Sequence, residues 1–413
     1  MMRFLSWFHR TPKTNPVPAS RCRTLRPRLE ALEDRCVPTH WTVTSPVDNV
    51  NVANSLRWAV AKAGSGDTID IQISGPIVLT NGELYLAYDV TIDSTNISLI
   101  HSGYSWISGN FQSRVFEVAP GAHVTLSYLE IIHGNGQPNN PSGQVVEGVG
   151  GAIANLGTLA LDYCTVTDNG SSLDAAGNRQ VSTRAGGGIA NMGTDRGIFG
   201  QLMLIHCLVT NNQSSNSGGG IYNQATVQIF NCSVSGNSSY GGGGIDNDST
   251  AVVVASHLVG NVATTGDGGA IESFGQLFVS NCEFLSNHAG FDGAAVVNHN
   301  GMQAYNCTFS DNHAGRNGGA ISNYGNAGPG TLVVYGCDFL DNSAAFQGGA
   351  IYNLAKASVA GSQLINNVAA QGGGIYNAIG AVLNLETSLL QSNSPDNLKN
   401  QGTYNDLGGN TFI

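Results

Sequence analysis

The sequence predicts an all-β protein that folds as a right-handed parallel β-helix, a solenoid, with a short N-terminal capping helix. A Gly-Gly-[Ala/Gly]-Ile-x-Asn unit recurs along the chain, and a Cys-x-[Phe/Val]-x-x-Asn unit lies between its copies. Short runs of alternating apolar and polar residues, typical of half-buried strands, join the two units. Charged residues make up only 11% of the chain and glycine accounts for 55 of 413 residues, which excludes a mainly helical repeat protein.

The first unit repeats at intervals of 24 to 36 residues. A unit of about 25 residues is too small to bury its own apolar side, but units stacked in parallel at ~4.8 Å share one continuous core. The longest intervals predict loops inserted into a coil at residues 168–184 and 324–330. The β-branched residue of the unit occupies nine positions: Ile153, Ile189, Ile221, Ile245, Ile271, Val296, Ile321, Ile351 and Ile375.

Stacking places equivalent residues of successive coils in columns. We expect the turn asparagines to hydrogen-bond along one column, interrupted by Ser273. We expect the repeat cysteines to form a packed row of thiols rather than disulfides, because side chains stacked in parallel rarely reach a disulfide dihedral. The asparagine column comprises Asn155, Asn191, Asn223, Asn247, Asn298, Asn323, Asn353 and Asn377. The cysteine column comprises Cys164, Cys207, Cys232, Cys282, Cys307 and Cys337.

A short helix is expected between Ser55 and Ala63. Leu56, Ala59 and Val60 share one face with Ala63, and Gly64 stops the helix. This helix is placed to cover the open apolar end of the first coil, which a solenoid needs for solubility.

The chain divides into four expected segments. Residues 1–40 form a basic, Pro-rich leader that is either unfolded or an export segment, and residues 41–135 form the N-terminal cap and first coils. Residues 136–393 form the repeated coils, and residues 394–413 form an irregular last coil.

Charge is distributed unevenly between the leader and the remainder of the chain. Residues 1–40 carry a net charge of +5, whereas residues 41–413 carry −16. A body this acidic repels phosphate backbones, so nucleic acid is not an expected partner. No run of 18 apolar residues is present, so no transmembrane helix is expected. The apolar stretch near the N-terminus is too short for an ordinary secretory signal.

Three segments resemble known families. The paired Gly-Gly-Ala-Ile and Phe-x-x-Asn units at 269–287, 309–321 and 339–351 resemble the repeats of polymorphic outer membrane proteins. The motifs Ser-Leu-Arg-Trp-Ala-Val and Gly-Asp-Thr-Ile within 55–69 resemble the opening of many bacterial surface β-helix proteins. Residues 26–38 resemble a leader motif of exported repetitive proteins in budding bacteria, and the alternative is a short amphipathic helix without an addressing role.

These resemblances imply a β-helix of the pectin-lyase-like superfamily that is secreted or associated with the cell surface or outer membrane. Several members of such families are adhesins, so a structural or adhesive role is expected. Polysaccharide and cell-envelope or matrix components are the expected partners.

Enzymatic chemistry is the alternative interpretation, because pectate lyases and polygalacturonases also fold as parallel β-helices. The sequence has no Asp-Asp pair and no Gly-His-Gly or Arg-x-Lys signature, and the few basic residues of the repeats form no evident cluster. We therefore identify no catalytic residues. A polysaccharide-acting lyase or hydrolase, or a carbohydrate-binding module, remains the second hypothesis.

One acidic patch is the candidate binding site. Asp246 and Glu272 share the column that follows the repeat isoleucine, and Asp267 and Asp292 share the column that precedes the glycine pair. Four carboxylates within three coils could bind Ca²⁺ or contact a sugar, and no other cofactor is expected. The alternative is a solvated acidic corner of the solenoid.

Overall fold

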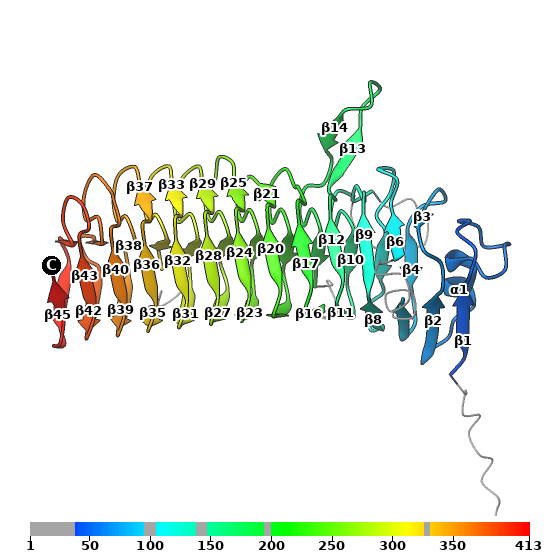
Figure 1. Cartoon of the computed structure of the whole chain (residues 1–413), viewed down its shortest axis with the longest axis horizontal. Coiled ribbons are helices and arrows are strands. Elements are labelled where there is room, and N and C mark those ends of the chain that lie inside the picture. The colour runs from blue at the N-terminus through cyan, green and yellow to red at the C-terminus, as the bar shows by residue number, and fades with distance from the viewer. Residues whose placement is uncertain (1–37, 95–104, 138–146, 194–199, 326–330) are drawn as a thin grey trace, which may run out of the picture. The chain divides into compact units, whose positions relative to one another are not determined.

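The computed structural model describes residues 38–94, 105–137, 147–193, 200–325 and 331–413. Residues 38–413 form one compact unit, a parallel β-solenoid of about 13 turns, and the described residues of this unit contain one short helix (Figure 1). The predicted all-β parallel β-helix is confirmed. Residues 1–37 of the expected leader and residues 326–330 of the second predicted insertion lie outside the described residues, and His40, expected at the end of the leader, is the first residue of β1.

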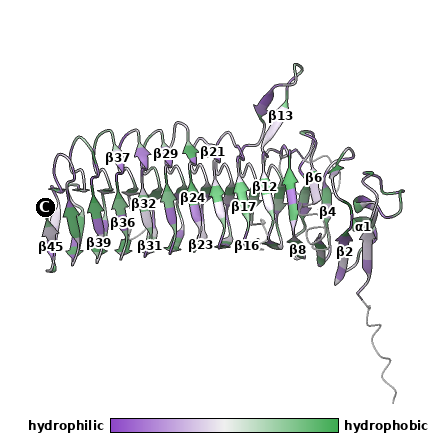
Figure 2. Cartoon of the chain, viewed as in Figure 1, coloured by the Kyte–Doolittle hydropathy of each residue, from purple (hydrophilic) through white to green (hydrophobic). Residues whose placement is uncertain are grey.

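The strands of sheet I are mostly five residues long and alternate between buried and partly exposed side chains. In β23, for example, Ala251 and Val253 are buried, whereas the residues on either side of them are partly exposed. Figure 2 shows the corresponding mixture of hydrophobic and hydrophilic residues within single strands. This alternation places one face of each strand in the core. Sheet I contains β1 (His40–Val43), β2 (Asp67–Ile71), β5 (Val90–Asp93), β8 (His123–Ser127), β11 (Thr158–Asp162), β16 (Gln201–Ile205), β19 (Thr226–Phe230), β23 (Thr250–Val254), β27 (Gln276–Ser280), β31 (Gly301–Tyr305), β35 (Thr331–Tyr335), β39 (Lys356–Ala360), β42 (Val382–Glu386) and β45 (Thr403–Asp406).

Most strands of sheet II, from β10 to β41, are built from the Ile-x-Asn part of the first repeat unit. The branched residue of each strand points into the core, and the middle residue points outward. Its strands are β4 (Leu84–Leu86), β7 (Phe116–Val118), β10 (Ile153–Asn155), β15 (Ile189–Asn191), β18 (Ile221–Asn223), β22 (Ile245–Asn247), β26 (Ile271–Ser273), β30 (Val296–Asn298), β34 (Ile321–Asn323), β38 (Ile351–Asn353), β41 (Ile375–Asn377) and β44 (Leu398–Asn400).

The three-residue strands of sheet III from β12 to β43 follow the cysteine position of the repeat and bury their central apolar residue. Phe284, Phe309 and Phe339 stack in this sheet, with ring centroids 4.7 and 4.8 Å apart. Its strands are β3 (Pro76–Val78), β6 (Ser105–Ser108), β9 (Leu129–Ile132), β12 (Thr165–Thr167), β17 (Leu208–Thr210), β20 (Ser233–Ser235), β24 (His257–Val259), β28 (Glu283–Leu285), β32 (Thr308–Ser310), β36 (Asp338–Leu340), β40 (Gln363–Ile365), β43 (Leu389–Gln391) and β46 (Thr411–Phe412).

Two smaller sheets complete the described strands. Sheet IV lies between sheets III and II along each coil and contains β21 (Ser238–Ser239), β25 (Val262–Ala263), β29 (His288–Ala289), β33 (His313–Ala314) and β37 (Ser343–Ala344). The antiparallel pair β13 (Ser171–Leu173) and β14 (Arg179–Val181) projects from the solenoid (Figure 1). This hairpin is the first predicted insertion.

The register of the sheets aligns equivalent repeat positions. Strands β18 and β22, for example, pair Tyr222 with Asp246 and Asn223 with Asn247. The six repeat cysteines are free and buried. Their contacts are those of a packed stack; the backbone N–H of Cys207 lies 3.2 Å from the sulfur of Cys232.

The predicted asparagine column forms a hydrogen-bonded ladder. Asn191 donates from Nδ2 to Oδ1 of Asn223 at 2.7 Å, and Asn223 makes the same bond to Asn247. The ladder is interrupted at Ser273, so the buried Oδ1 of Asn298 has no hydrogen-bond partner. The amide bonds link adjacent coils in addition to the backbone pairing.

A second ladder, which was not predicted, follows sheet III. Asn287 accepts from both the backbone N–H and Nδ2 of Asn261, at 3.0 and 3.1 Å, and donates to the carbonyl of Leu258 and to Asn312. Each of these buried amides therefore satisfies several polar groups of two neighbouring coils. The ladder comprises Asn169, Asn212, Asn237, Asn261, Asn287, Asn312, Asn342, Asn367 and Asn393.

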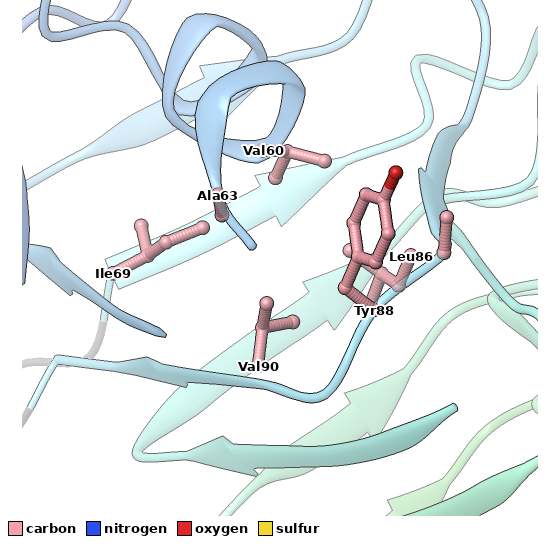
Figure 3. Close-up of a pocket in the computed structure, with 7 residues that line it drawn as sticks. Val60, Ala63, Ile69, Leu86, Tyr88 and Val90 are labelled. Atoms are coloured by element: carbon pink, nitrogen blue, oxygen red, sulfur yellow. The ribbon is translucent and has the colours of Figure 1, made fainter. Parts of the chain in front are cut away.

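The predicted capping helix is α1 (Leu56–Lys62). Ser55 is its N-cap, and the Ser55 hydroxyl accepts a hydrogen bond from the backbone N–H of Trp58. Leu56 and Ala59 are buried against the first coils, as expected. Figure 3 shows the small apolar space between this helix and the neighbouring strands, where Val60 and Tyr88 are among the lining residues.

The final segment was expected to be an irregular coil. It contains β44, β45 and β46, each of which adds one more parallel strand to one of the three long sheets.

Candidate functional site

The outward face of sheet II carries the candidate site. The middle residues of β18, β22 and β26 are Tyr222, Asp246 and Glu272, which lie in register on adjacent strands. Asp267 and Asp292 lie in the turns that lead into β26 and β30, and the backbone N–H of Asp292 donates to Oδ1 of Asp267 at 2.9 Å. We call the four predicted carboxylates and the side chains that contact them the acidic face.

Asp246 is the most constrained carboxyl of the acidic face. It is only 4% exposed, and its Oδ1 has no hydrogen-bond partner. Burial raises the pKa of Asp246 well above its usual range, the nearby charges of Glu272 and Asp248 raise it further, and a hydrogen bond between this carboxyl and the Ser217 side chain opposes the rise. A glycine turn makes room for this side chain: Gly242 has φ +60°, and a β-carbon there would lie 2.8 Å from that of Asp246.

Asp267 is partly exposed, and its ionisation is also disfavoured. Burial raises the pKa of the Asp267 carboxyl to about 6. The hydrogen bond from the Asp292 backbone and the neighbouring His299 oppose this effect, whereas the charges of Asp292 and Glu272 add to it. The acidic face therefore exchanges protons in a pH range where an ordinary aspartate is fully ionised.

Asp292 is buried and fully engaged. Its Oδ1 accepts hydrogen bonds from the backbone N–H and Nδ2 of Asn317, at 2.7 and 3.0 Å, and its Oδ2 accepts from the hydroxyl of Tyr324. Burial raises the pKa of Tyr324, and the hydrogen bond to Asp292 raises it further. Asp292 consequently orients Tyr324 toward the carboxylates.

Two residues that were not singled out from the sequence complete the centre of the acidic face. His299 lies with its Nε2 3.5 Å from Oε1 of Glu272. Its ring stacks between Phe274 and Tyr324, with centroids 4.3 and 5.3 Å away. Phe274, His299 and Tyr324 each follow the turn residue of their coil, so this aromatic column was visible as a repeat position in the sequence.

Tyrosines extend the acidic face in both directions along the solenoid. Toward the N-terminus, the Tyr222 hydroxyl donates to Asp248 at 2.8 Å. Toward the C-terminus, Tyr352 and Tyr376 occupy the same column as Glu272, and their rings lie 5.7 Å apart. Aromatic rings therefore flank the carboxylates at both ends.

A buried ion cluster lies under the N-terminal part of sheet II and had no counterpart in the sequence analysis. Arg114 is fully buried, and its Nη1 lies 2.6 Å from Glu83 and 3.4 Å from Glu117. Its remaining donors bond backbone carbonyls, including that of Val149. Burial raises the pKa of Glu83 to about 7. The side chains of Arg114, Glu83 and Glu117 are completely buried, which indicates that this cluster has a structural role.

The structure thus brings all four predicted carboxylates together, and it assigns the asparagine and cysteine columns to the interior packing. In the described part of the chain, no group of three or more His, Cys, Asp or Glu side chains is arranged to hold a metal ion. Asp292 is already engaged, which leaves Asp267 and Glu272 as the more accessible carboxylates. Binding of Ca²⁺ to this patch stays a prediction.

Three stretches of the chain match the Chlamydia polymorphic membrane protein repeat, at residues 206–224, 306–324 and 336–354. No curated protein matches the chain. Among solved structures, an alginate lyase, AlyF-OU02 in complex with G6, is similar at 14% sequence identity and a TM-score of 0.44, over 91% of this chain and 86% of the lyase.

Within the described residues, no helix is both long and apolar enough to cross a membrane. The matched stretches coincide with three of the cysteine-to-asparagine coils of the solenoid, and such repeats suggest a protein of the cell surface. The chain is a parallel β-helix that carries repeats of the Chlamydia polymorphic membrane protein type.

Proposed function

We propose that this protein is an exported or cell-surface β-helix with an adhesive role, and that it binds polysaccharide through the acidic face of sheet II. The observation that carries the proposal is the aromatic column of Phe274, His299 and Tyr324 beside the carboxylates. Flat rings offer apolar surfaces to sugar rings, and a few placed polar groups fix the orientation of a bound ligand.

The exposure of the rings supports contact with a large ligand. Phe274 is 41% exposed, and the loops that enter sheet II carry the exposed rings of Phe291 and Phe346. The carboxylates therefore lie between two series of aromatic side chains, one before and one after the strands. A polymer lying along the solenoid would pass from one coil to the next every ~4.8 Å and so contact the tyrosines, the carboxylates and the aromatic column in turn.

A binding screen tests this proposal. The purified full chain is incubated with insoluble or immobilised polysaccharides, and retention is compared with that of a Phe274→Ala variant. Phe278, on sheet I of the same coil, provides the matched Phe278→Ala control. Retention that is lost only in the Phe274 variant supports the proposal, and equal retention of all three proteins contradicts it.

A polysaccharide-cleaving enzyme is the second candidate, and one observation favours it. His299 lies beside Glu272, and Tyr324 donates to Asp292, so two potential proton-transfer pairs lie on one face. The same screen should therefore follow product formation as new chain ends. A catalytic role predicts that Tyr324→Phe abolishes product formation and leaves polysaccharide retention intact; a screen without products refutes it.

A further inference from the structure

We propose that the acidic face recognises a protonated amine carried on a sugar ring, as in a de-N-acetylated hexosamine polymer, rather than an acidic polysaccharide. This inference rests on the proposed function, because it names the class of polysaccharide that the same face would bind. It follows from the charge, from an unsatisfied buried acceptor and from the placement of the aromatic rings.

The acidic face is rich in carboxyl groups and poor in basic groups. Five carboxyl groups influence one another there: Asp246, Asp248, Asp267, Glu272 and Asp292. The basic groups that the structure places beside them are His299, near Glu272, and Arg316, whose guanidinium lies over the Phe291 ring at 5.4 Å. An acidic polymer would be repelled by this arrangement, whereas a cation would relieve the mutual repulsion of the carboxylates.

One buried atom points to a hydrogen-bond donor as the missing partner. Oδ1 of Asp246 is buried without a hydrogen bond, although the side chain lies in register with Glu272 in the middle of the cluster. Buried polar atoms normally have a partner. An ammonium group supplies three donors and a positive charge, so it could bond several carboxylates of this face at once.

The surroundings favour an organic cation over a metal ion. The carboxylates are distributed along two columns instead of around one point, and the described residues provide no cluster suited to a metal. Ca²⁺ requires about six to eight oxygen ligands around one centre. The rings of Phe274 and Tyr222 border the carboxylates, and aromatic faces attract ammonium groups. A ring that bears an amine matches both features.

Binding is tested by calorimetric titration of the full chain at neutral pH and low salt with glucosamine oligomers and with their N-acetylated forms. The amine-bearing oligomer should bind at least about tenfold more tightly. The variant Asp267→Asn/Glu272→Gln should lose this preference. The matched control Asp338→Asn/Glu283→Gln, on sheet III, should keep it. Circular dichroism and melting temperature verify that all variants are folded.

Several results would overturn the inference. Equal affinity for the free and acetylated oligomers, or retention of the preference in the Asp267/Glu272 variant, would contradict recognition of the amine. Spermidine that binds as tightly as the amino-sugar oligomer would show that charge alone is recognised. Binding of neutral or acidic polysaccharides without the amino sugar would leave the proposed function standing and refute the inference, whereas failure of every polysaccharide would refute both.

Discussion

Replacing Asp267 by asparagine should stabilise the protein at neutral and alkaline pH. Oδ1 of Asp267 accepts the backbone N–H of Asp292, and an asparagine oxygen can accept the same bond. The substitution Asp267→Asn therefore removes a charge while preserving the hydrogen bond and the size of the side chain. Its effect on the free energy of unfolding reports the electrostatic cost of the acidic face.

The magnitude follows from the pKa of Asp267, which is about 6 in the folded chain against an ordinary value of 3.8. Because the folded pKa is raised, this group's contribution to stability is fully present below pH 3.8 and is lost as pH rises through 6. One pKa unit corresponds to about 1.4 kcal/mol, which sets an upper bound of about 3 kcal/mol. Solvent screening of this partly exposed side chain reduces the expected loss to about 1–2 kcal/mol.

The assay is urea or thermal unfolding of both proteins across a series of pH values from about 4 to 8. The variant should match the wild type near pH 4 and become more stable as Asp267 ionises in the wild type. The control Asp338→Asn, on β36, makes the same chemical change away from the acidic face. A difference that is constant with pH, or a variant less stable at pH 8, would refute the assigned electrostatic cost.

Three further predictions concern the ladder, the buried ion cluster and the cation patch. Ser273→Asn should raise the free energy of unfolding by about 1 kcal/mol, measured by urea denaturation, because its amide would donate to the unpaired Oδ1 of Asn298. Arg114→Met should lower it by about 3–5 kcal/mol in the same assay, since two buried glutamates lose their cation; an unchanged midpoint would contradict the burial of this cluster. Millimolar Ca²⁺ should raise the melting temperature modestly, because a cation near the carboxylates relieves their mutual repulsion even without a dedicated set of metal ligands, and a variant with Asp267→Asn and Glu272→Gln should not respond.

Repetition made much of the fold predictable. The strand positions, the asparagine column and the buried cysteines each follow from a residue type that returns at the same place in most coils. Because the strands of adjacent coils pair in register, residues at the same repeat position come into contact. The meeting of Asp246 with Glu272 was predictable for the same reason, because adjacent coils pair these positions directly.

Contacts that depend on side-chain reach were not predictable in this way. Tyr324 contacts Asp292 from a different column, across the width of sheet II, and His299 approaches Glu272 in the same manner. The repeat position of a residue predicts which coil it belongs to and its place within that coil. It does not predict the rotamer of the side chain or which neighbouring residue the side chain reaches. Arg114 was missed because it belongs to no repeat, and its buried partners, Glu83 just before β4 and Glu117 on β7, lie in coils without the motif.

The asparagine column of sheet II is interrupted at the acidic face. Ser273 interrupts the asparagine column in the coil that also carries Glu272, and the unpaired Oδ1 of Asn298 lies one coil further on. Two further buried atoms without hydrogen bonds lie close by. Oδ1 of Asp246 is one coil before Ser273, and Nε2 of His299 is in the coil of Asn298. In folded proteins, buried polar atoms without hydrogen bonds occur mainly at functional sites, and interactions elsewhere in the protein offset the stability that they cost. Here the uninterrupted asparagine ladder beside sheet III, which passes through these same coils, provides that support, so the solenoid can keep its register beside buried polar atoms that have no hydrogen bonds.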